Sequence, residues 1–195
     1  MANLKSLLLL VLFSGLLLNC SPAQEKLKQT SSPKNSKVNE ETKRFESKED
    51  NFSINISHEP FQTRNMGSEI ADKKGVDVGK LFVWKFEKFA YTVMYMGPYD
   101  RDGNDLPQDW LDLDDGTRKG ILNEGGKLIS EKPFSYAKYQ GREFRSLTKD
   151  EVKSITRIYL IDTMGYQMWG LYLSEKDEKE VLEVLDSFKL LKEQN

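Results

Sequence analysis

From Phe52 onward the chain is a succession of short apolar-rich segments separated by turn residues, and this pattern constrains the fold more than any other feature. Segments of this length and composition are typical of strands. In one of them Leu81 and Val83 alternate with Phe82 and Trp84, so both faces of the strand are apolar. We expect a sheet that is covered on both faces. The predicted strands span residues 52–56, 80–86, 91–96, 128–136, 142–147, 155–161 and 166–173.

These strands follow one another closely, which favours antiparallel hairpins. We place one turn near Lys88 and two later turns at Gly141 and Gly165, because glycine is common in tight turns.

Two helices interrupt the strands. The first is predicted over about residues 107–123, with Pro107 in its first turn and Gly125 just after its end. Its buried face is predicted to carry Trp110, Leu113, Thr117 and Ile121. The second helix follows Ser174, a residue type that caps helices, and is predicted to bury Val181, Leu182 and Leu185. Antiparallel strands with inserted and appended helices predict an α+β fold.

The same region contains short motifs that carry a family resemblance. They are Ala90-Tyr91-Thr92-Val93, Leu113-Asp114-Asp115-Gly116-Thr117, Gly126-Lys127-Leu128-Ile129-Ser130-Glu131, Tyr139-Gln140-Gly141-Arg142-Glu143, Arg157-Ile158-Tyr159-Leu160 and Leu185-Asp186-Ser187-Phe188-Lys189-Leu190-Leu191. Together they resemble a family of uncharacterised bacterial exported lipoproteins whose domain is similar to PsbP and Mog1. The resemblance implies an antiparallel sheet with helices packed on its faces, an α/β/α sandwich. PsbP assists a photosynthetic complex and Mog1 binds a small GTPase. The resemblance includes no residues that match either of these two binding sites.

The N-terminus is typical of an export signal. Lys5 supplies a positive charge, an apolar stretch follows, and the only cysteine of the chain, Cys20, comes directly after it. The motif Leu17-Leu18-Asn19-Cys20 resembles a lipobox, although lipoboxes usually carry a small residue where this chain has Asn19. We therefore predict a lipoprotein signal peptide over residues 1–19 and acylation of Cys20, with palmitate among the acyl chains. Cleavage after Ala23, which would release a secreted protein, is the alternative.

The predicted lipid anchor would hold the protein on the bilayer in the cell envelope, at the outer membrane or at the periplasmic face of the inner membrane. Residues 20–51 are almost entirely polar, with Phe45 as the only aromatic residue. Such a segment buries too little apolar area to offset its conformational entropy. We therefore predict a flexible tether over residues 20–51 and a globular domain over residues 52–195.

The sequence offers little for catalysis. The single histidine, His58, lies between Ser57 and Glu59, but neighbours in sequence do not assemble a catalytic triad, and Gly-x-Ser-x-Gly is absent. Zinc and iron sites lack histidine and cysteine ligands. A formal charge of -2 gives no net positive field to attract nucleic acid, so no nucleic-acid partner is predicted.

An acidic segment is the one candidate metal site. Asp100, Asp102 and Asn104 have the alternate spacing with which a calcium loop begins. The sixth and twelfth positions of that loop require Gly and Glu, and this chain has Asp105 and Leu111 there. The other interpretation is a turn followed by carboxylates at the start of a helix.

Arg142 also stands out, because it lies in a predicted strand directly after Gly141. Pairing with a buried acid is the interpretation that we favour, and anion binding is the alternative. Taken together, the sequence predicts a non-enzymatic module that binds a protein or a small ligand, or assists assembly, in the cell envelope. The alternatives are a carboxylate-based enzyme, with the acidic segment as the place of the chemistry, a calcium-binding domain, and a surface lipoprotein that contacts host or matrix components.

Overall fold

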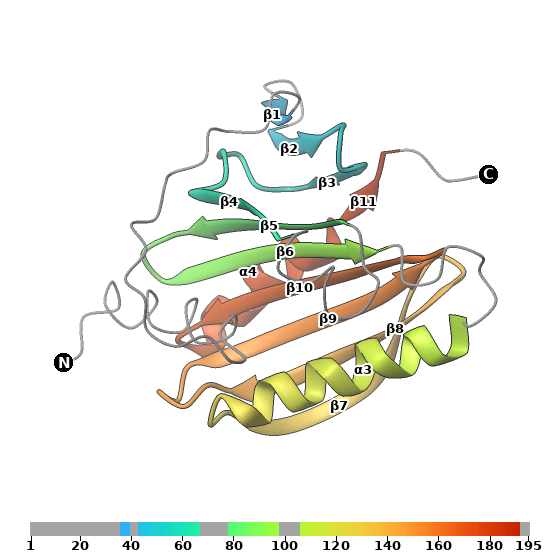
Figure 1. Cartoon of the computed structure of the whole chain (residues 1–195). Coiled ribbons are helices and arrows are strands. Elements are labelled where there is room, and N and C mark those ends of the chain that lie inside the picture. Colours follow the sequence, from blue (N-terminus) through green and yellow to red (C-terminus); the bar gives the residue numbers. More distant parts are fainter. Residues whose placement is uncertain (1–35, 40–42, 67–77, 98–105, 192–195) are drawn as a thin grey trace, which may run out of the picture.

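The computed structural model describes residues 36–39, 43–66, 78–97 and 106–191. Within them, a seven-stranded antiparallel sheet has the order β4-β5-β6-β10-β9-β8-β7, and a smaller sheet has the order β1-β2-β3-β11 (Figure 1). The strands are β1 (Ser36–Asn39), β2 (Arg44–Ser47), β3 (Phe52–Ile54), β4 (Gln62–Asn65), β5 (Val78–Lys85), β6 (Phe89–Gly97), β7 (Lys127–Tyr136), β8 (Tyr139–Leu147), β9 (Lys153–Ile161), β10 (Met164–Tyr172) and β11 (Lys189–Leu190). The helices are α3 (Leu106–Asn123) and α4 (Glu175–Asp186).

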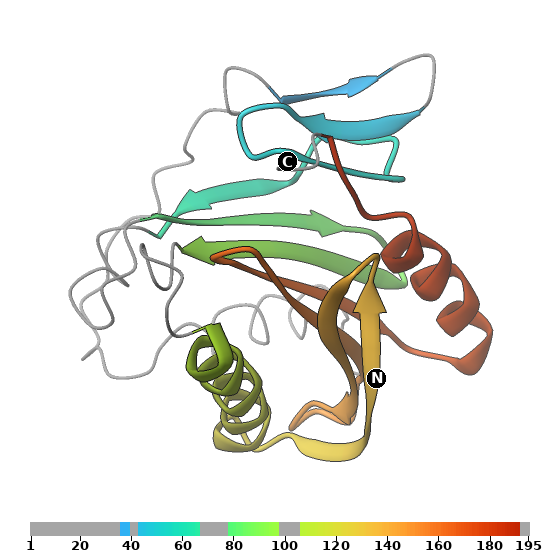
Figure 2. The same cartoon turned by 90° about the vertical axis from the view of Figure 1, so that its right-hand side faces the viewer.

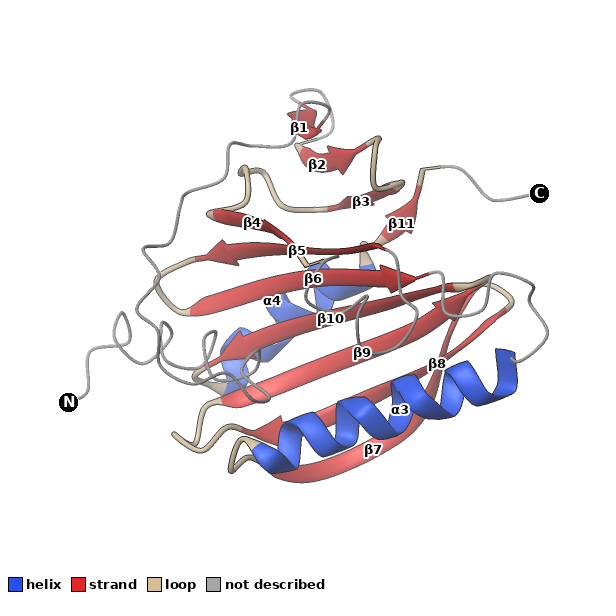
Figure 3. Ribbon diagram, in the orientation of Figure 1, coloured by secondary structure: helices blue, strands red, loops and turns tan. Residues whose placement is uncertain are grey.

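The two helices cover opposite faces of the large sheet, as Figure 2 shows with the sheet seen near its edge. Helix α4 contacts β10 and β6, and α3 contacts β7 and β9 (Figure 3). The predicted α+β class, an antiparallel sheet with helices packed on its faces, is therefore confirmed.

Each face of the sheet has its own apolar cluster. On the α4 face, Phe82, Trp84 and Val93 pack with Val181 and Leu185 of the helix. On the α3 face, the helix residues Trp110 and Leu113 pack against Phe144, Ile158 and Leu160 of β8 and β9. Leu81 and Val83 are buried on the α3 side of β5, away from Phe82 and Trp84, as the alternating pattern predicts.

A single glycine allows α4 to approach the sheet closely. A Cβ atom added at Gly170 of β10 would lie 2.2 Å from Cγ1 of Val181. The helix begins after Ser174, which caps it together with Asp177, as the sequence indicated. Helix α4 therefore lies directly on β10.

Two predicted turn positions are wrong. Gly141 lies within β8 and Gly165 within β10. The turns instead contain Ala137 and Asp162, which adopt the left-handed conformation with φ of 49° and 53°. Gly141 is needed inside the strand for space, because a Cβ atom there would lie 2.6 Å from Cδ1 of Tyr159.

The boundary predicted between tether and domain also needs correction. Strands β1 and β2 lie inside the range assigned to the tether, and β2 pairs with β3. Phe45 is 0% exposed and packs against Trp84, with the ring centroids 5.1 Å apart. The folded part therefore begins no later than Ser36, because one aromatic side chain joins an otherwise polar segment to the core.

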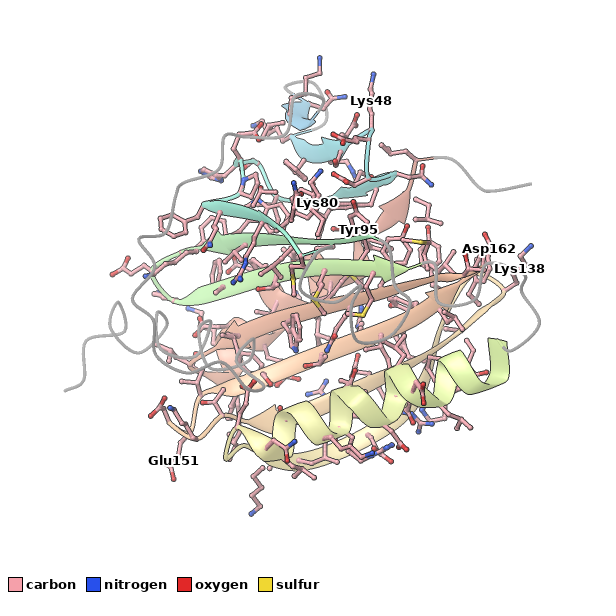
Figure 4. All side chains as sticks on the ribbon, in the orientation of Figure 1. Lys48, Lys80, Tyr95, Lys138, Glu151 and Asp162 are labelled. Atoms are coloured by element: carbon pink, nitrogen blue, oxygen red, sulfur yellow. The ribbon has the colours of Figure 1, made fainter. Side chains whose placement is uncertain are left out.

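A buried ion pair ties the segment after β2 to the large sheet. Nζ of Lys80, which is labelled in Figure 4, lies 2.9 Å from both carboxylate oxygens of Asp50. Tyr95 and Ser47 also donate hydrogen bonds to this carboxylate. Burial and the bond to Asp50 raise the pKa of Tyr95 well above its usual value. Both oxygens of the Asp50 carboxylate thus accept hydrogen bonds, and these bonds connect the small sheet to the large one.

No helix in the described ranges is both long enough and apolar enough to cross a membrane.

Candidate functional site

The candidate site is a pocket on the α4 side of the large sheet, which we call the Arg157 pocket. It has a volume of about 430 Å³. Its lining residues come from the β7–β8 hairpin, from β9, and from the end of α4 and the chain that leads into β11. Figure 2 shows the tip of this hairpin beside that end of the helix. The described residues that line it are Phe134, Ser135, Tyr136, Ala137, Arg157, Tyr159, Leu185, Asp186, Phe188, Lys189 and Leu190.

Aromatic rings form the walls of the pocket. Tyr159 and Phe188 stack with centroids 6.3 Å apart and an angle of 7° between the ring planes. Phe134 and Tyr136 contact Tyr159 from the hairpin, at 6.0 and 5.8 Å between centroids. The hydroxyl of Tyr136 accepts a hydrogen bond of 2.9 Å from the amide of Leu190. That bond joins the hairpin to the chain leaving α4, so the walls are fixed relative to each other.

A buried guanidinium group forms the polar part of the pocket. Arg157 is 3% exposed, and its guanidinium carbon lies 4.2 Å from the ring centroid of Phe134. Nε donates to Glu143 at 2.9 Å, and Nη1 donates to Asp186 at 2.6 Å. The two carboxylates differ in their surroundings, because the Glu143 side chain is 1% exposed and the Asp186 side chain is 59% exposed.

Glu143 is the buried partner that keeps Arg157 in place. Lys132 lies 3.1 Å and Arg145 3.4 Å from Oε1 of this carboxylate. Burial alone would raise the pKa of Glu143, but hydrogen bonds from Arg157 and Lys132 outweigh it and lower the pKa below its usual value. Glu143 therefore carries its negative charge at neutral pH and balances the buried guanidinium.

The network continues to α4 through Arg145, which pairs with Glu178 of that helix. Tyr172 donates a hydrogen bond to Glu178 at 3.2 Å, and burial together with this carboxylate raises the pKa of Tyr172 to about 12. The ion pairs around Glu143 and Glu178 and the charged residues that line the pocket together comprise four cationic side chains and three carboxylates. The cations are Arg145, Arg157, Lys132 and Lys189, and the carboxylates are Glu143, Glu178 and Asp186.

A second hollow of about 520 Å³ lies on the other side of the sheet, near the start of α3. Its lining includes Trp110, Tyr139 and Leu160, with Lys138 and Asp162 at one end of the sheet (Figure 4). Asp162 accepts a hydrogen bond of 3.2 Å from the Tyr139 hydroxyl. The charged groups of this hollow are turn residues, the exposed Lys138 and the partly exposed Asp162, whereas the Arg157 pocket contains a buried and positioned cation. We therefore regard the Arg157 pocket as the better candidate.

The predicted calcium residues Asp100, Asp102 and Asn104 and the predicted acylation site Cys20 lie outside the described residues. Among the residues that are described, three or more acidic, histidine or cysteine side chains nowhere gather as a metal site would require. His58 is exposed, and its carbonyl oxygen accepts a hydrogen bond of 2.9 Å from Nε1 of Trp84.

The interpretation of Arg142 as the partner of a buried acid is confirmed. Its Nε atom lies 2.7 Å from Asp114, which is buried on α3. Arg118, one turn further along the helix, contacts Asp114 at 3.2 Å and Asp115 at 2.7 Å. Asp114, through Arg142 of β8, and Arg118, which also lies 3.0 Å from Glu131 of β7, therefore bind α3 to the sheet.

Sequence reasoning missed the Arg157 pocket. Arg157 and Glu143 appeared in strands whose apolar neighbours suggested only a core. Arg157 itself was the available indication, because an arginine that is buried in an apolar strand needs a charged partner. The sequence does not show that Glu143 and Asp186 would be its partners, since they lie 14 and 29 residues away.

The fold and the pocket define a class: an α+β domain with an antiparallel sheet covered on both faces and an aromatic pocket at one end. No protein-family model matches the chain, and no curated protein matches it significantly. Among solved structures, the chain is similar to cyanobacterial PsbP (CyanoP) from Synechocystis, with a TM-score of 0.46 and 16% identity over 75% of this chain and 91% of that one. It is also similar to the Ran-binding protein Mog1p from Saccharomyces cerevisiae, with a TM-score of 0.37 and 13% identity over 80% of this chain and 96% of that one. These are the two folds that the sequence resemblance named.

Proposed function

We propose that the protein is a non-enzymatic binding or assembly module, held in the bacterial cell envelope by acyl chains on Cys20, and that the Arg157 pocket is its binding surface. The observation that carries the proposal is the make-up of this pocket: aromatic walls around one buried, fixed cation. Ligand sites are typically concave and mostly apolar, with a few polar groups that set orientation.

The pocket is better suited to binding than to acid–base chemistry. A carboxylate pair that acts as acid and base needs two carboxylates in different environments beside the substrate. The described lining residues supply one carboxylate, Asp186, and Arg157 already donates to it. Glu143 lies behind Arg157 and is held as an anion by three cationic side chains.

The proposed anchor rests on the sequence. A short apolar segment followed by the only cysteine is what lipoprotein export requires, and two or three acyl chains hold a protein stably on a bilayer. Strand β1 begins at Ser36, so residues 21–35 would connect the acylated cysteine to the folded part.

Labelling with an alkyne-bearing palmitate analogue tests the anchor. We expect the wild-type protein to be labelled and to enter the detergent phase on phase separation. Cys20→Ala should lose both properties, whereas Ser21→Ala, next to it, should keep them. An unlabelled wild-type protein whose N-terminus is Gln24 would contradict the anchor.

Photo-crosslinking in intact envelopes tests the binding surface. A benzophenone amino acid at Lys189, which is exposed and lines the pocket, should form a defined crosslinked product. The matched control replaces Lys119, which is exposed on α3 across the sheet. Equal products from both positions, or none from Lys189, would show that the pocket is not the binding surface.

A further inference from the structure

We propose that the Arg157 pocket recognises a carboxylate that carries a flat apolar group, as an aromatic carboxylic acid does. This inference rests on the proposed function, because it takes the pocket to be the binding surface, and it adds the chemical class of the ligand.

The apolar part of the ligand follows from the walls. Four aromatic side chains line the pocket, and aromatic rings bind other flat groups well through offset or edge-to-face contacts. Its volume of about 430 Å³ is enough for one small molecule or for one aromatic group of a larger partner. A flat ring of this kind would lie against the aromatic cluster that Tyr136, Tyr159 and Phe188 form by direct contact with one another.

The anionic part follows from Arg157. A guanidinium has five N–H donors and binds carboxylates in a planar, two-point geometry. The bond to Glu143 is buried, so breaking it would leave an unpaired charge in the core. The bond to Asp186 is different, because the Asp186 side chain is 59% exposed and can return to water.

Asp186 therefore occupies the place that a ligand carboxylate would take. It is the last residue of α4, and it contacts Arg157 from the solvent side. A ligand carboxylate that displaced it would exchange one ion pair for another and would add the contacts of its apolar group. Lys189, which also lines the pocket, leaves the site with one more cation than carboxylates and favours an anionic ligand.

An NMR titration of the mature chain carrying Cys20→Ser tests this inference, with 3-phenylpropionate as the probe and 3-phenylpropionamide as its uncharged counterpart. We expect the acid to shift the backbone amide signals of Ala137 and Lys189 but not that of Lys119, with a Kd on the order of 1 mM for a ligand of this size. The amide should bind at least about tenfold more weakly, since it lacks the charge-assisted bond to Arg157.

Two variants identify the roles of the polar and apolar parts. Asp186→Asn removes the competing carboxylate and should tighten binding of the acid roughly threefold or more. Leu190→Trp adds volume at a half-buried lining position and should abolish binding of the acid. Neither variant removes the buried pair of Arg157 and Glu143, so both should fold.

The inference is overturned if the acid and the amide bind equally, if neither binds, or if Asp186→Asn weakens binding of the acid. The last result would mean that Asp186 supports binding of the acid instead of competing with it for Arg157. These outcomes are separate from a failure of the proposed function. If Lys189 crosslinks a partner in envelopes while the acid does not bind, the pocket is a binding surface for a ligand of another class.

Discussion

Replacement of Phe45 by alanine tests whether the segment before β3 belongs to the folded core. Phe45 lies within the range that the sequence assigns to a flexible tether, yet the structure buries it completely. In a tether this substitution would have no effect on stability. In the structure it removes a ring that contacts Phe52, Phe82 and Trp84, with centroids 5.9, 5.8 and 5.1 Å away.

The expected loss is about 4 kcal/mol. Truncation of a buried phenylalanine to alanine costs about 3–5 kcal/mol through lost transfer energy and the cavity that remains. Phe45 belongs in the upper half of that range, because each aromatic pair adds about 0.5–1.5 kcal/mol beyond burial. Since domains are stable by about 5–15 kcal/mol, the variant should lose a large part of its stability.

Urea unfolding followed by tryptophan fluorescence measures this change, since Trp84 contacts Phe45 directly. The matched control is Phe61→Ala, which truncates the same residue type at a position that is 61% exposed and should change stability by less than about 0.5 kcal/mol. Deletion of residues 1–35 should leave the transition intact, whereas deletion of residues 1–51 should abolish it. Equal unfolding midpoints for the two phenylalanine variants would refute the assignment of Phe45 to the core.

Two further predictions concern α4 and the buried charges. Gly170→Ala should destabilise the protein by about 1–3 kcal/mol in urea unfolding, because the new Cβ atom would lie 2.2 Å from Val181, and Val181→Ala in the same chain should recover part of the loss. Recovery by an unrelated core truncation would argue against this local clash. The lowered pKa of Glu143 contributes stability that is present above the unfolded pKa of about 4.3 and is lost as pH falls through the lower folded pKa. Urea unfolding of Glu143→Gln should show lower stability at pH 7 and a weaker dependence on pH below about 4.3 than the wild type; parallel profiles would contradict a charged Glu143.

Most of the large sheet could be predicted because its strands carry their own signal. The alternation of Leu81, Phe82, Val83 and Trp84 indicates a strand covered on both faces, and the structure places two of these residues on each face. Strand β4 could not be found in this way, because its residues Gln62–Asn65 are polar and it is a strand only through pairing with β5. Its conformation depends on long-range contacts, which cannot be inferred from the local composition of the strand.

The turns were mispredicted for a related reason. Glycine in a sequence indicates either freedom of φ or a lack of space for a side chain, and the sequence does not distinguish the two. Gly141 and Gly170 both serve the second purpose, because Tyr159 and Val181 occupy the space where their side chains would be. Only the packing of distant elements shows this difference, and the same packing creates the candidate site.

The existence of the Arg157 pocket follows from where α4 ends. Because Gly170 has no side chain, α4 can lie directly on β10 and cover the middle of the sheet. The helix ends at Asp186, beside the hairpin of β7 and β8. The chain then turns away to pair β11 with β3, and Phe188 packs against Tyr136 of the hairpin and Tyr159 of β9. A helix that continued past Asp186 in the same direction would occupy this space and close the pocket. The end of α4 therefore has two effects. It places Asp186 against Arg157, and it leaves an aromatic pocket open above this positioned cation.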